Sequence, residues 1–175
     1  AANIVAEKVL NAAGSGYSTD VANGVRKAAD AGAGVINVSI TYGNDSNTVA
    51  AINYAAAKGA FIVWAGGNSA QNLLNNLNTS GLTQVAIQRL IFAGSVNSVN
   101  VASSFTNKPG TGSLVNTAGA KASYATRWVM APGEAILAPY TVAGNGAYYL
   151  WSGTSMAAPI VSGSLMLLQN AWPIL

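Results

Sequence analysis

Apolar runs and segments of helical periodicity alternate along the first part of the chain. Residues 4–10, 34–40 and 60–65 are short, apolar and rich in β-branched side chains, which is typical of buried strands. Residues 18–32 and 47–59 carry apolar side chains at the three- and four-residue spacing of a helix. This strand–helix–strand–helix–strand order predicts right-handed crossovers, a parallel sheet and an α/β fold.

The later part of the chain predicts shorter strands, a hairpin and a long helix. Residues 71–80 are rich in Asn and predict a loop, and the strongly apolar residues 155–171 predict a buried helix. A β-hairpin is expected around glycines 144 and 146. The strand-like segments lie at 91–93, 100–102, 128–130, 135–137 and 147–151.

Composition narrows the class of protein. Of the 175 residues, 51% are hydrophobic and only 7% are charged, against about 25% charged residues in an average domain. The chain is therefore neither disordered nor a coiled coil. The net charge of +3 comes from eight basic and five acidic residues that are scattered, so we expect no nucleic-acid partner. No apolar run approaches the roughly 18 residues of a membrane helix, so we expect no membrane contact.

Two residue types are absent. Without cysteine the chain forms no disulfide, and without cysteine or histidine it forms no zinc finger. Five scattered carboxylates make no calcium loop, and no phosphate-binding glycine fingerprint opens a helix, so we expect neither a metal nor a cofactor. The lack of histidine also removes the commonest general base near neutral pH.

Two places in the predicted fold can carry chemistry. Ligands of parallel sheets bind beyond the carboxyl ends of the strands, where residues 39–43 and Gly66–Gly67–Asn68 fall. Ser155 begins the last helix after Gly153, and the unpaired N–H groups of such a helix end can stabilise an oxyanion. Both features also have ordinary interpretations, a helix cap for Ser155 and a turn for Asn68.

The stretch GTSMAAP at residues 153–159 resembles the serine motif of the subtilisin-like serine proteases, the subtilases. A lipase-like serine hydrolase is excluded because the serine does not lie in G-x-S-x-G. The resemblance implies a three-layer α/β/α fold with a mostly parallel sheet and endopeptidase activity. Further stretches similar to family landmarks are ANIVAEKVLNAAGSGYS at 2–18, GVINVS at 34–39, AGGN at 65–68, SFTN at 104–107 and VMAPG at 129–133.

The resemblance also implies roles for individual residues. Ser155 is the expected nucleophile, and the Asn68 side chain and the Ser155 N–H are the expected oxyanion donors, supported by Thr154. An extended polypeptide substrate is expected to lie between two strand-like edges, with a wall behind the residue that precedes the scissile bond. The edges are Gly14, Ser15 and Gly16 opposite Ser39, Ile40 and Thr41, and the wall is Ala65, Gly66 and Gly67. Since Asp45 is the sole carboxylate near these segments, we expect an apolar or broad preference.

The chain departs from the family pattern in its missing acid and base. Subtilases carry an aspartate in D-[ST]-G and a histidine in H-G-T, and neither motif occurs here. We therefore interpret residues 1–175 as a partial catalytic domain, the C-terminal two-thirds, and expect the chain alone to be inactive because a serine without a base is a weak nucleophile. The alternative is a noncatalytic module that binds peptides or serves a structural role.

Two further expectations follow from this interpretation. An incomplete sheet leaves open edges, so we expect either the missing N-terminal segment or another copy of the chain as a partner. The family resemblance and the absence of cysteine favour a secreted or cell-surface location in a bacterium.

Overall fold

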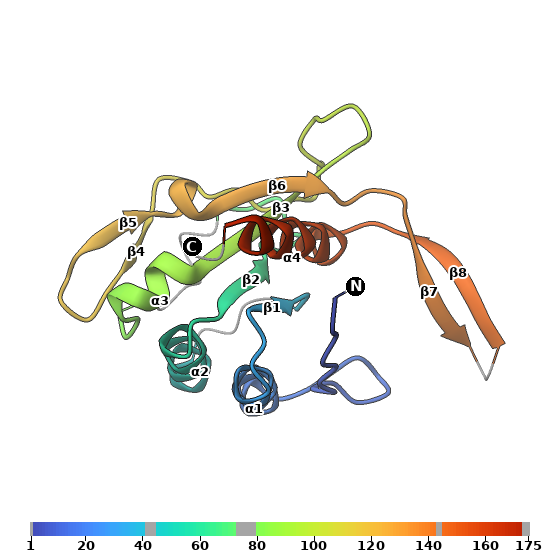
Figure 1. Ribbon diagram of the computed structural model, residues 1–175. Coiled ribbons are helices and arrows are strands. Elements are labelled where there is room, and N and C mark those ends of the chain that lie inside the picture. Colours follow the sequence, from blue (N-terminus) through green and yellow to red (C-terminus); the bar gives the residue numbers. More distant parts are fainter. Residues whose placement is uncertain (1, 41–44, 73–79, 143–144, 173–175) are drawn as a thin grey trace.

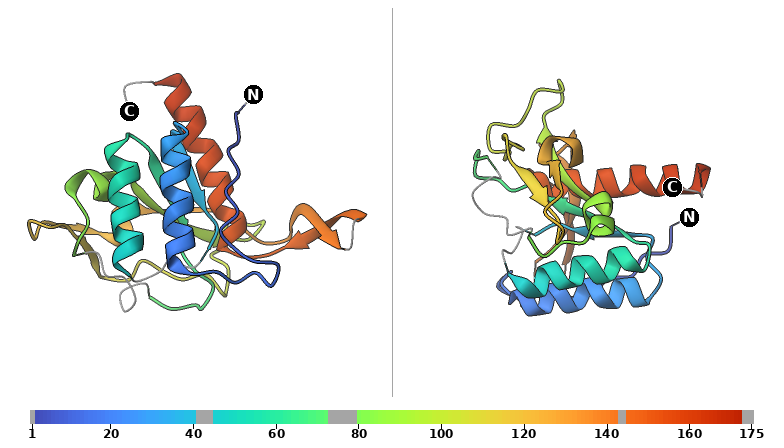
Figure 2. Two further views of the ribbon diagram at one scale, coloured as in Figure 1. Left: turned by 90° about the horizontal axis from the view of Figure 1, so that it is seen from below. Right: turned by 90° about the vertical axis from the view of Figure 1, so that its left-hand side faces the viewer.

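A parallel sheet between two layers of helices forms the body of the computed structural model, which describes residues 2–40, 45–72, 80–142 and 145–172 (Figures 1 and 2). Four strands lie side by side in the order β1, β2, β3, β6. Helices α1 and α2 cover one face and α4 covers the other. The predicted three-layer α/β/α fold is therefore confirmed.

The central sheet consists of β1 (Val35–Val38), β2 (Phe61–Ala65), β3 (Leu90–Val96) and β6 (Trp128–Pro132). The helices are α1 (Ser18–Asp30), α2 (Ser46–Ala57), α3 (Gln84–Arg89), the 3₁₀ turn η2 (Tyr124–Arg127) and α4 (Thr154–Ala171). Two antiparallel hairpins complete the fold, β4 (Ser113–Val115) with β5 (Lys121–Ser123) and β7 (Ile136–Val142) with β8 (Asn145–Trp151).

The two faces of the sheet carry side chains of different size. Strand β2 turns Trp64 toward α1 and α2, and its neighbour Ala65 toward α4, because successive side chains of a strand alternate between faces. The α4 face is lined by small residues, with Ala93 on the sheet and Ala157 on the helix both fully buried. Helix α4 can therefore lie close to the sheet.

Most predicted elements are confirmed, and the hairpin of β7 and β8 is longer than expected and projects away from the layers (Figure 1). The predicted strand at 4–10 is wrong: these residues form no ladder, and Ile4 is 88% exposed. A strand needs hydrogen bonds to a neighbour as well as β-branched residues, and within the described residues β1 pairs with β2 alone.

The predicted strand at 100–102 is also wrong, because Ala102 forms only a single bridge, with Val96. A tight turn begins at Asn97, whose Oδ1 accepts from the N–H groups of Val99 and Val101. Helix α4 has the predicted extent, but it is not buried all round, since its outer face leaves Leu167 73% exposed.

Three loops among the described residues share one conformation built on an asparagine. In each loop the asparagine Oδ1 accepts from the N–H groups two and four residues later, and its own N–H donates to the carbonyl four residues later. The residue three positions on has a positive φ, which glycine or asparagine adopts most readily. The loops begin at Asn11, Asn97 and Asn116.

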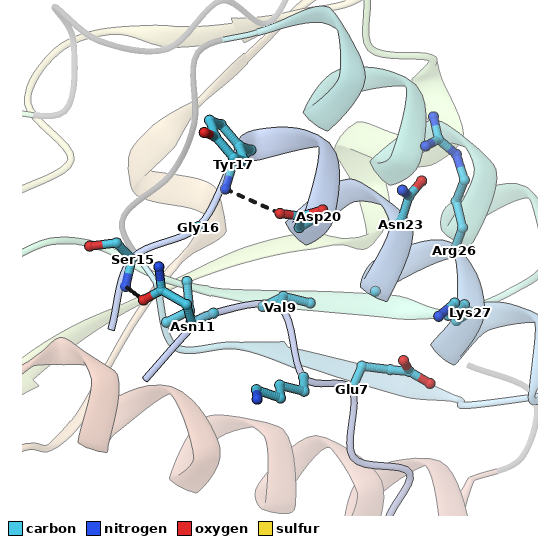
Figure 3. Close-up of a pocket in the computed structure, with 13 residues that line it drawn as sticks. Glu7, Val9, Asn11, Ser15, Gly16, Tyr17, Asp20, Asn23, Arg26 and Lys27 are labelled. Carbon is cyan, nitrogen blue, oxygen red and sulfur yellow. Dashed lines mark hydrogen bonds between the residues drawn. The ribbon is translucent and has the colours of Figure 1, made fainter. Parts of the chain in front are cut away.

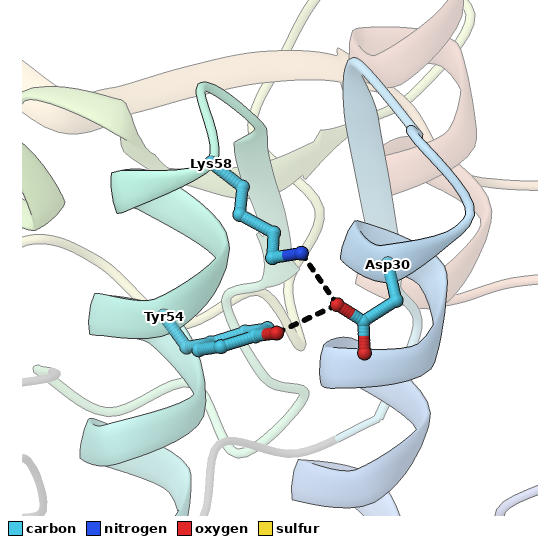
Figure 4. A network of polar contacts seen from close by, with 3 residues as sticks. All are labelled: Asp30, Tyr54 and Lys58. Atoms are coloured by element: carbon cyan, nitrogen blue, oxygen red, sulfur yellow. Dashed lines mark hydrogen bonds and ion pairs between the residues drawn. The ribbon is translucent and has the colours of Figure 1, made fainter.

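The two outer helices are joined at their C-terminal ends by an exposed polar cluster (Figure 4). Asp30 at the end of α1 accepts from Lys58 Nζ and from the Tyr54 hydroxyl, each at 2.6 Å. These hydrogen bonds lower the pKa of Asp30, and the same contact with Asp30 raises the pKa of Lys58. Being exposed, this ion pair is screened by salt.

Helix α2 begins at Ser46, with Asp45 as its N-cap, rather than at the predicted Asn47 or Thr48. Asp45 Oδ1 accepts from the N–H groups of Asn47 and Thr48 at 2.9 and 3.2 Å, and Oδ2 accepts from Thr48 Oγ1 at 2.8 Å. Burial would raise the pKa of Asp45, but the hydrogen bonds from Thr48 and Asn47 help to outweigh it, so the pKa lies below its usual value.

We expect Asp45→Ala to lower the free energy of unfolding by about 1 kcal/mol at neutral pH, the usual effect of losing a helix cap. Because the pKa of Asp45 is lower in the folded state than in the unfolded state, the stabilisation is fully present above the unfolded-state pKa of about 4. It is lost as the pH falls from there through the lower pKa of the folded state. Urea unfolding at pH 7 and pH 3 measures this, with Asp45→Asn as the uncharged control. An effect of Asp45→Ala that is equal at both pH values would contradict it.

Candidate active site

The loop after β2 caps the N-terminus of α4. Gly153 occupies the N-cap position of α4 and has no side chain with which to bind the first N–H groups. Asn68 supplies that acceptor from another part of the chain: its Oδ1 accepts from Thr154 N at 2.8 Å and from Thr154 Oγ1 at 2.9 Å. The cap thus fixes Asn68 beside the residue that precedes Ser155.

Thr154 ties the helix to the loop a second time. Its side chain is fully buried, and its Oγ1 accepts from Gly67 N at 3.0 Å while donating to Asn68. Asn68 Nδ2 has no acceptor within the described residues, and it would lie 3.3 Å from a Cβ added at Gly153. As the second residue of α4, Ser155 has an N–H without an intrahelical acceptor. Two donor groups without an acceptor among the described residues, Asn68 Nδ2 and the Ser155 N–H, therefore lie at the start of α4.

The Ser155 hydroxyl faces the end of β1. Its Oγ donates to the Ser39 carbonyl at 3.1 Å, and Ser39 Oγ donates in return to the Ser155 carbonyl at 2.8 Å. Asn37 Nδ2 donates to Ser39 Oγ at 3.0 Å. Ser39, which was predicted on a substrate-binding edge, is therefore in direct contact with Ser155.

The VMAPG stretch is hydrogen bonded to the start of α4 through Gly133. Gly153 N donates to the Gly133 carbonyl at 2.7 Å, and Gly133 N donates to the Val96 carbonyl at 3.0 Å at the end of β3. A Cβ at Gly133 would overlap Ser95 Oγ and approach the Gly153 carbonyl, so only glycine fits. The start of α4 is therefore fixed to the carboxyl end of β3.

One residue that shapes the site was not predicted. Asn107 Oδ1 accepts from Ser69 N at 3.0 Å and from Gln71 N at 3.1 Å, and its Nδ2 donates to the Gly66 carbonyl at 2.9 Å. It thus binds the loop on both sides of Asn68. The run SFTN, already noted as similar to a family landmark, was the available signal.

The two predicted substrate edges differ in how much of each is described and in what holds it. Thr41 lies outside the described residues. The Ile40 carbonyl accepts from the buried Trp64 Nε1 at 2.8 Å, which anchors that edge to β2. On the opposite edge, Gly14 N and Ser15 N both donate to Asn11. The Gly16 N–H has no acceptor among the described residues.

The structure brings some predicted residues together and leaves others apart. Ala65, Gly66 and Gly67 are buried, and a Cβ at Gly66 would overlap the Trp128 ring. Ser39, Gly67, Asn68, Thr154 and Ser155 form one connected cluster. Within the described residues, no hydrogen bond joins this cluster to Gly14, Ser15 or Gly16.

A cavity of about 610 Å³ lies elsewhere, between residues 7–17 and α1 (Figure 3). Charged side chains of both signs surround it, among them Glu7, Asp20 and Arg26. Neither Asn68 nor Ser155 lines it. We assign it no chemistry.

The cluster holds a serine hydroxyl and N–H donors, but no described group beside the hydroxyl can act as a base. In the described part of the chain no lysine or carboxylate is hydrogen bonded to Ser155, and the sequence has no histidine. The same residues contain no group of three metal-binding side chains. No described helix combines the length and the apolar character needed to cross a membrane.

Comparison with known proteins identifies the family. The subtilase family model matches residues 1–175, and the chain belongs to the subtilase family. It is 37% identical over 171 residues to thermitase of Thermoactinomyces vulgaris, covering 97% of the chain and 52% of thermitase. It is 35% identical over 172 residues to the thermophilic serine proteinase of Bacillus sp. strain AK1, covering 95% of the chain and 36% of that protein.

The solved structure of sphericase superposes with a TM-score of 0.69 at 26% identity, over 95% of the chain and 54% of sphericase. The recognition of the family from the GTSMAAP stretch is therefore confirmed. The chain spans between about a third and about half of the length of these relatives.

We expect Thr154→Val to lower the free energy of unfolding by about 1–3 kcal/mol, because it leaves the buried Gly67 N–H without an acceptor. Thr154→Ser keeps the hydroxyl and loses one methyl group, worth about 0.8 kcal/mol. Denaturant unfolding of both variants measures the difference. Equal losses in the two variants would show that the hydroxyl bridge contributes nothing.

Proposed function

We propose that residues 1–175 are part of the catalytic domain of a serine endopeptidase, with Ser155 as nucleophile and Asn68 as an oxyanion donor. The observation that carries this proposal is the capping of α4 by Asn68, which places a free amide beside the serine of GTSMAAP. Membership of the subtilase family supports the same reaction class.

In the proposed reaction, Ser155 Oγ attacks the carbonyl carbon of the scissile peptide while a base takes the hydroxyl proton. The carbonyl oxygen becomes an oxyanion, which accepts from Asn68 Nδ2 and Ser155 N–H. The amine leaves with a proton returned by the base, and the acyl group stays on Ser155. Water activated by the same base then releases the acid product.

The base belongs to a part of the enzyme that this chain does not contain. Within the described residues the acceptor of the Ser155 proton is the Ser39 carbonyl, which cannot take up a proton at neutral pH. We propose that an aspartate- and histidine-bearing segment completes the site and that the chain alone is inactive. The absence of any described base beside Ser155 also favours the alternative, a noncatalytic peptide-binding module.

The proposed substrate is an extended polypeptide. Gly16 and the end of β1 offer backbone groups for strand-like pairing, and the buried Ala65, Gly66 and Gly67 offer an uncharged wall. No charged side chain is hydrogen bonded to Asn68, Thr154 or Ser155 within the described residues, which supports an apolar or broad preference. Family membership and the lack of cysteine support a secreted or cell-surface bacterial location.

We expect a fluorophosphonate probe to label Ser155 rapidly only when the aspartate- and histidine-bearing segment is fused ahead of residue 1. In subtilisin, loss of the base lowers turnover about 10⁶-fold, about as much as loss of the whole triad. Mass spectrometry locates the label, and Ser155→Ala is the control.

Two outcomes of the labelling experiment would count against the proposal. Equally rapid labelling of the bare chain would overturn its expected inactivity. No labelling of the completed enzyme would overturn Ser155 as nucleophile and favour the noncatalytic alternative.

We expect the bare chain to self-associate, and the chain with the added segment to be monomeric. In the described structure β1 pairs only with β2, so its other edge offers unpaired backbone groups, and the outer face of α4 exposes Met166, Leu167 and Leu168. Size-exclusion chromatography with light scattering measures the mass of each form. A stable monomer of the bare chain at high concentration would contradict the expectation.

A further inference from the structure

We infer that Asn107 is a positioning residue that sets the orientation of Asn68, an inference that rests on the proposed function. The three side-chain hydrogen bonds of Asn107 go to backbone groups on either side of Asn68: the Gly66 carbonyl before it, and the N–H groups of Ser69 and Gln71 after it. Asn107 N also donates to the Gly67 carbonyl at 2.9 Å. Asn107 makes none of these bonds with Asn68 itself.

The backbone of the Asn68 loop is adapted to this clamp. Gly67 has a φ of +102°, and a Cβ there would overlap Asn107 Nδ2. Ala70 has a φ of +54°, a left-handed conformation that residues with a side chain rarely adopt. Its N–H donates to the Phe105 carbonyl at 2.8 Å. Residues 105–107 therefore bind the loop in a conformation that includes a left-handed alanine.

The clamp is anchored to β3. Thr106, which is buried, accepts from Ser95 N through its Oγ1 at 3.0 Å, and Ser95 Oγ lies 2.7 Å from Ser103 Oγ. The start of α4 is fixed to the same strand end through Gly133 and Val96. Both proposed oxyanion donors are thus positioned relative to one end of β3, Asn68 through Asn107 and Ser155 through Gly133.

Loss of Asn107 is expected to change kcat rather than KM. The Asn68 amide stabilises charge that develops in the transition state, and a displacement of about 1 Å of such a group lowers the rate by up to about 100-fold. Among the proposed substrate-binding residues, the described hydrogen bonds of Asn107 reach the backbone of Gly66 and Gly67 in the uncharged wall but neither of the two substrate edges, so the larger effect is expected on kcat. We expect Asn107→Ala to lower kcat about 10- to 100-fold with KM changed less than about twofold.

The chain offers a matched control in Asn116. Its Oδ1 accepts from the N–H groups of Ala118 and Ala120, and its Nδ2 donates to Gln84 Oε1. Asn116→Ala therefore also removes three side-chain hydrogen bonds, but in the turn between β4 and β5, where no described residue is hydrogen bonded to Asn68. It should leave kcat and KM unchanged.

A double-mutant cycle in the completed enzyme tests the inference. If Asn107 acts through Asn68, the variant with both residues changed to alanine has the same kcat as Asn68→Ala. Additive losses, or an Asn107→Ala variant indistinguishable from Asn116→Ala, would overturn the inference. In subtilisin, removing the equivalent asparagine donor costs on the order of 10²–10³ in kcat. An Asn68→Ala variant with unchanged kcat would instead refute the proposed function.

A second measurement needs no activity. In the ¹⁵N-labelled completed enzyme, Asn107→Ala should shift the Asn68 side-chain amide resonances and speed hydrogen exchange at Ser69 N and Gln71 N, whereas Asn116→Ala should not. Asn107→Asp retains the acceptor oxygen, so it should keep the protection of Ser69 and Gln71. Unchanged Asn68 resonances and unchanged exchange in Asn107→Ala would overturn the inference.

Discussion

The site depends on a helix cap provided by a distant loop. Because Gly153 cannot cap α4, the Asn68 carboxamide takes its place, with Oδ1 bound to both Thr154 N and Thr154 Oγ1. A carboxamide is planar, so fixing its oxygen through two hydrogen bonds also fixes the direction of its N–H groups. One interaction therefore stabilises the helix end and aims a donor beside Ser155.

The packing of α4 makes this cap possible. Ala93 on β3 and Ala157 on α4 lie in a buried layer of small residues, and larger side chains would hold the helix farther from the sheet. On the opposite face Trp64 fills the space beneath α1 and α2, and its Nε1 binds the Ile40 carbonyl. The large and small layers together bring the ends of β1, β2 and β3 to the start of α4.

The sequence predicts the elements of this fold better than their contacts. Buried parallel strands are continuous apolar runs, so 34–40 and 60–65 are recognisable, whereas 4–10 has the same character but pairs with no strand of the described residues. The proposed roles of Asn68 and Ser155 rest on the AGGN and GTSMAAP stretches. Asn107 could not be found from periodicity or spacing, because it meets Ser69 only in three dimensions, from 38 positions away.

The described contacts hold Ser155 in position but include no group that could activate it. Ser155 Oγ is held by a reciprocal pair of hydrogen bonds with Ser39, and the donors beside it are held by Asn107, Thr154 and Gly133. None of these contacts involves a group that can accept a proton at neutral pH. In the proposed enzyme the oxyanion donors are therefore set by this chain alone, and the incoming base has only to draw the Ser155 hydroxyl away from one neutral carbonyl.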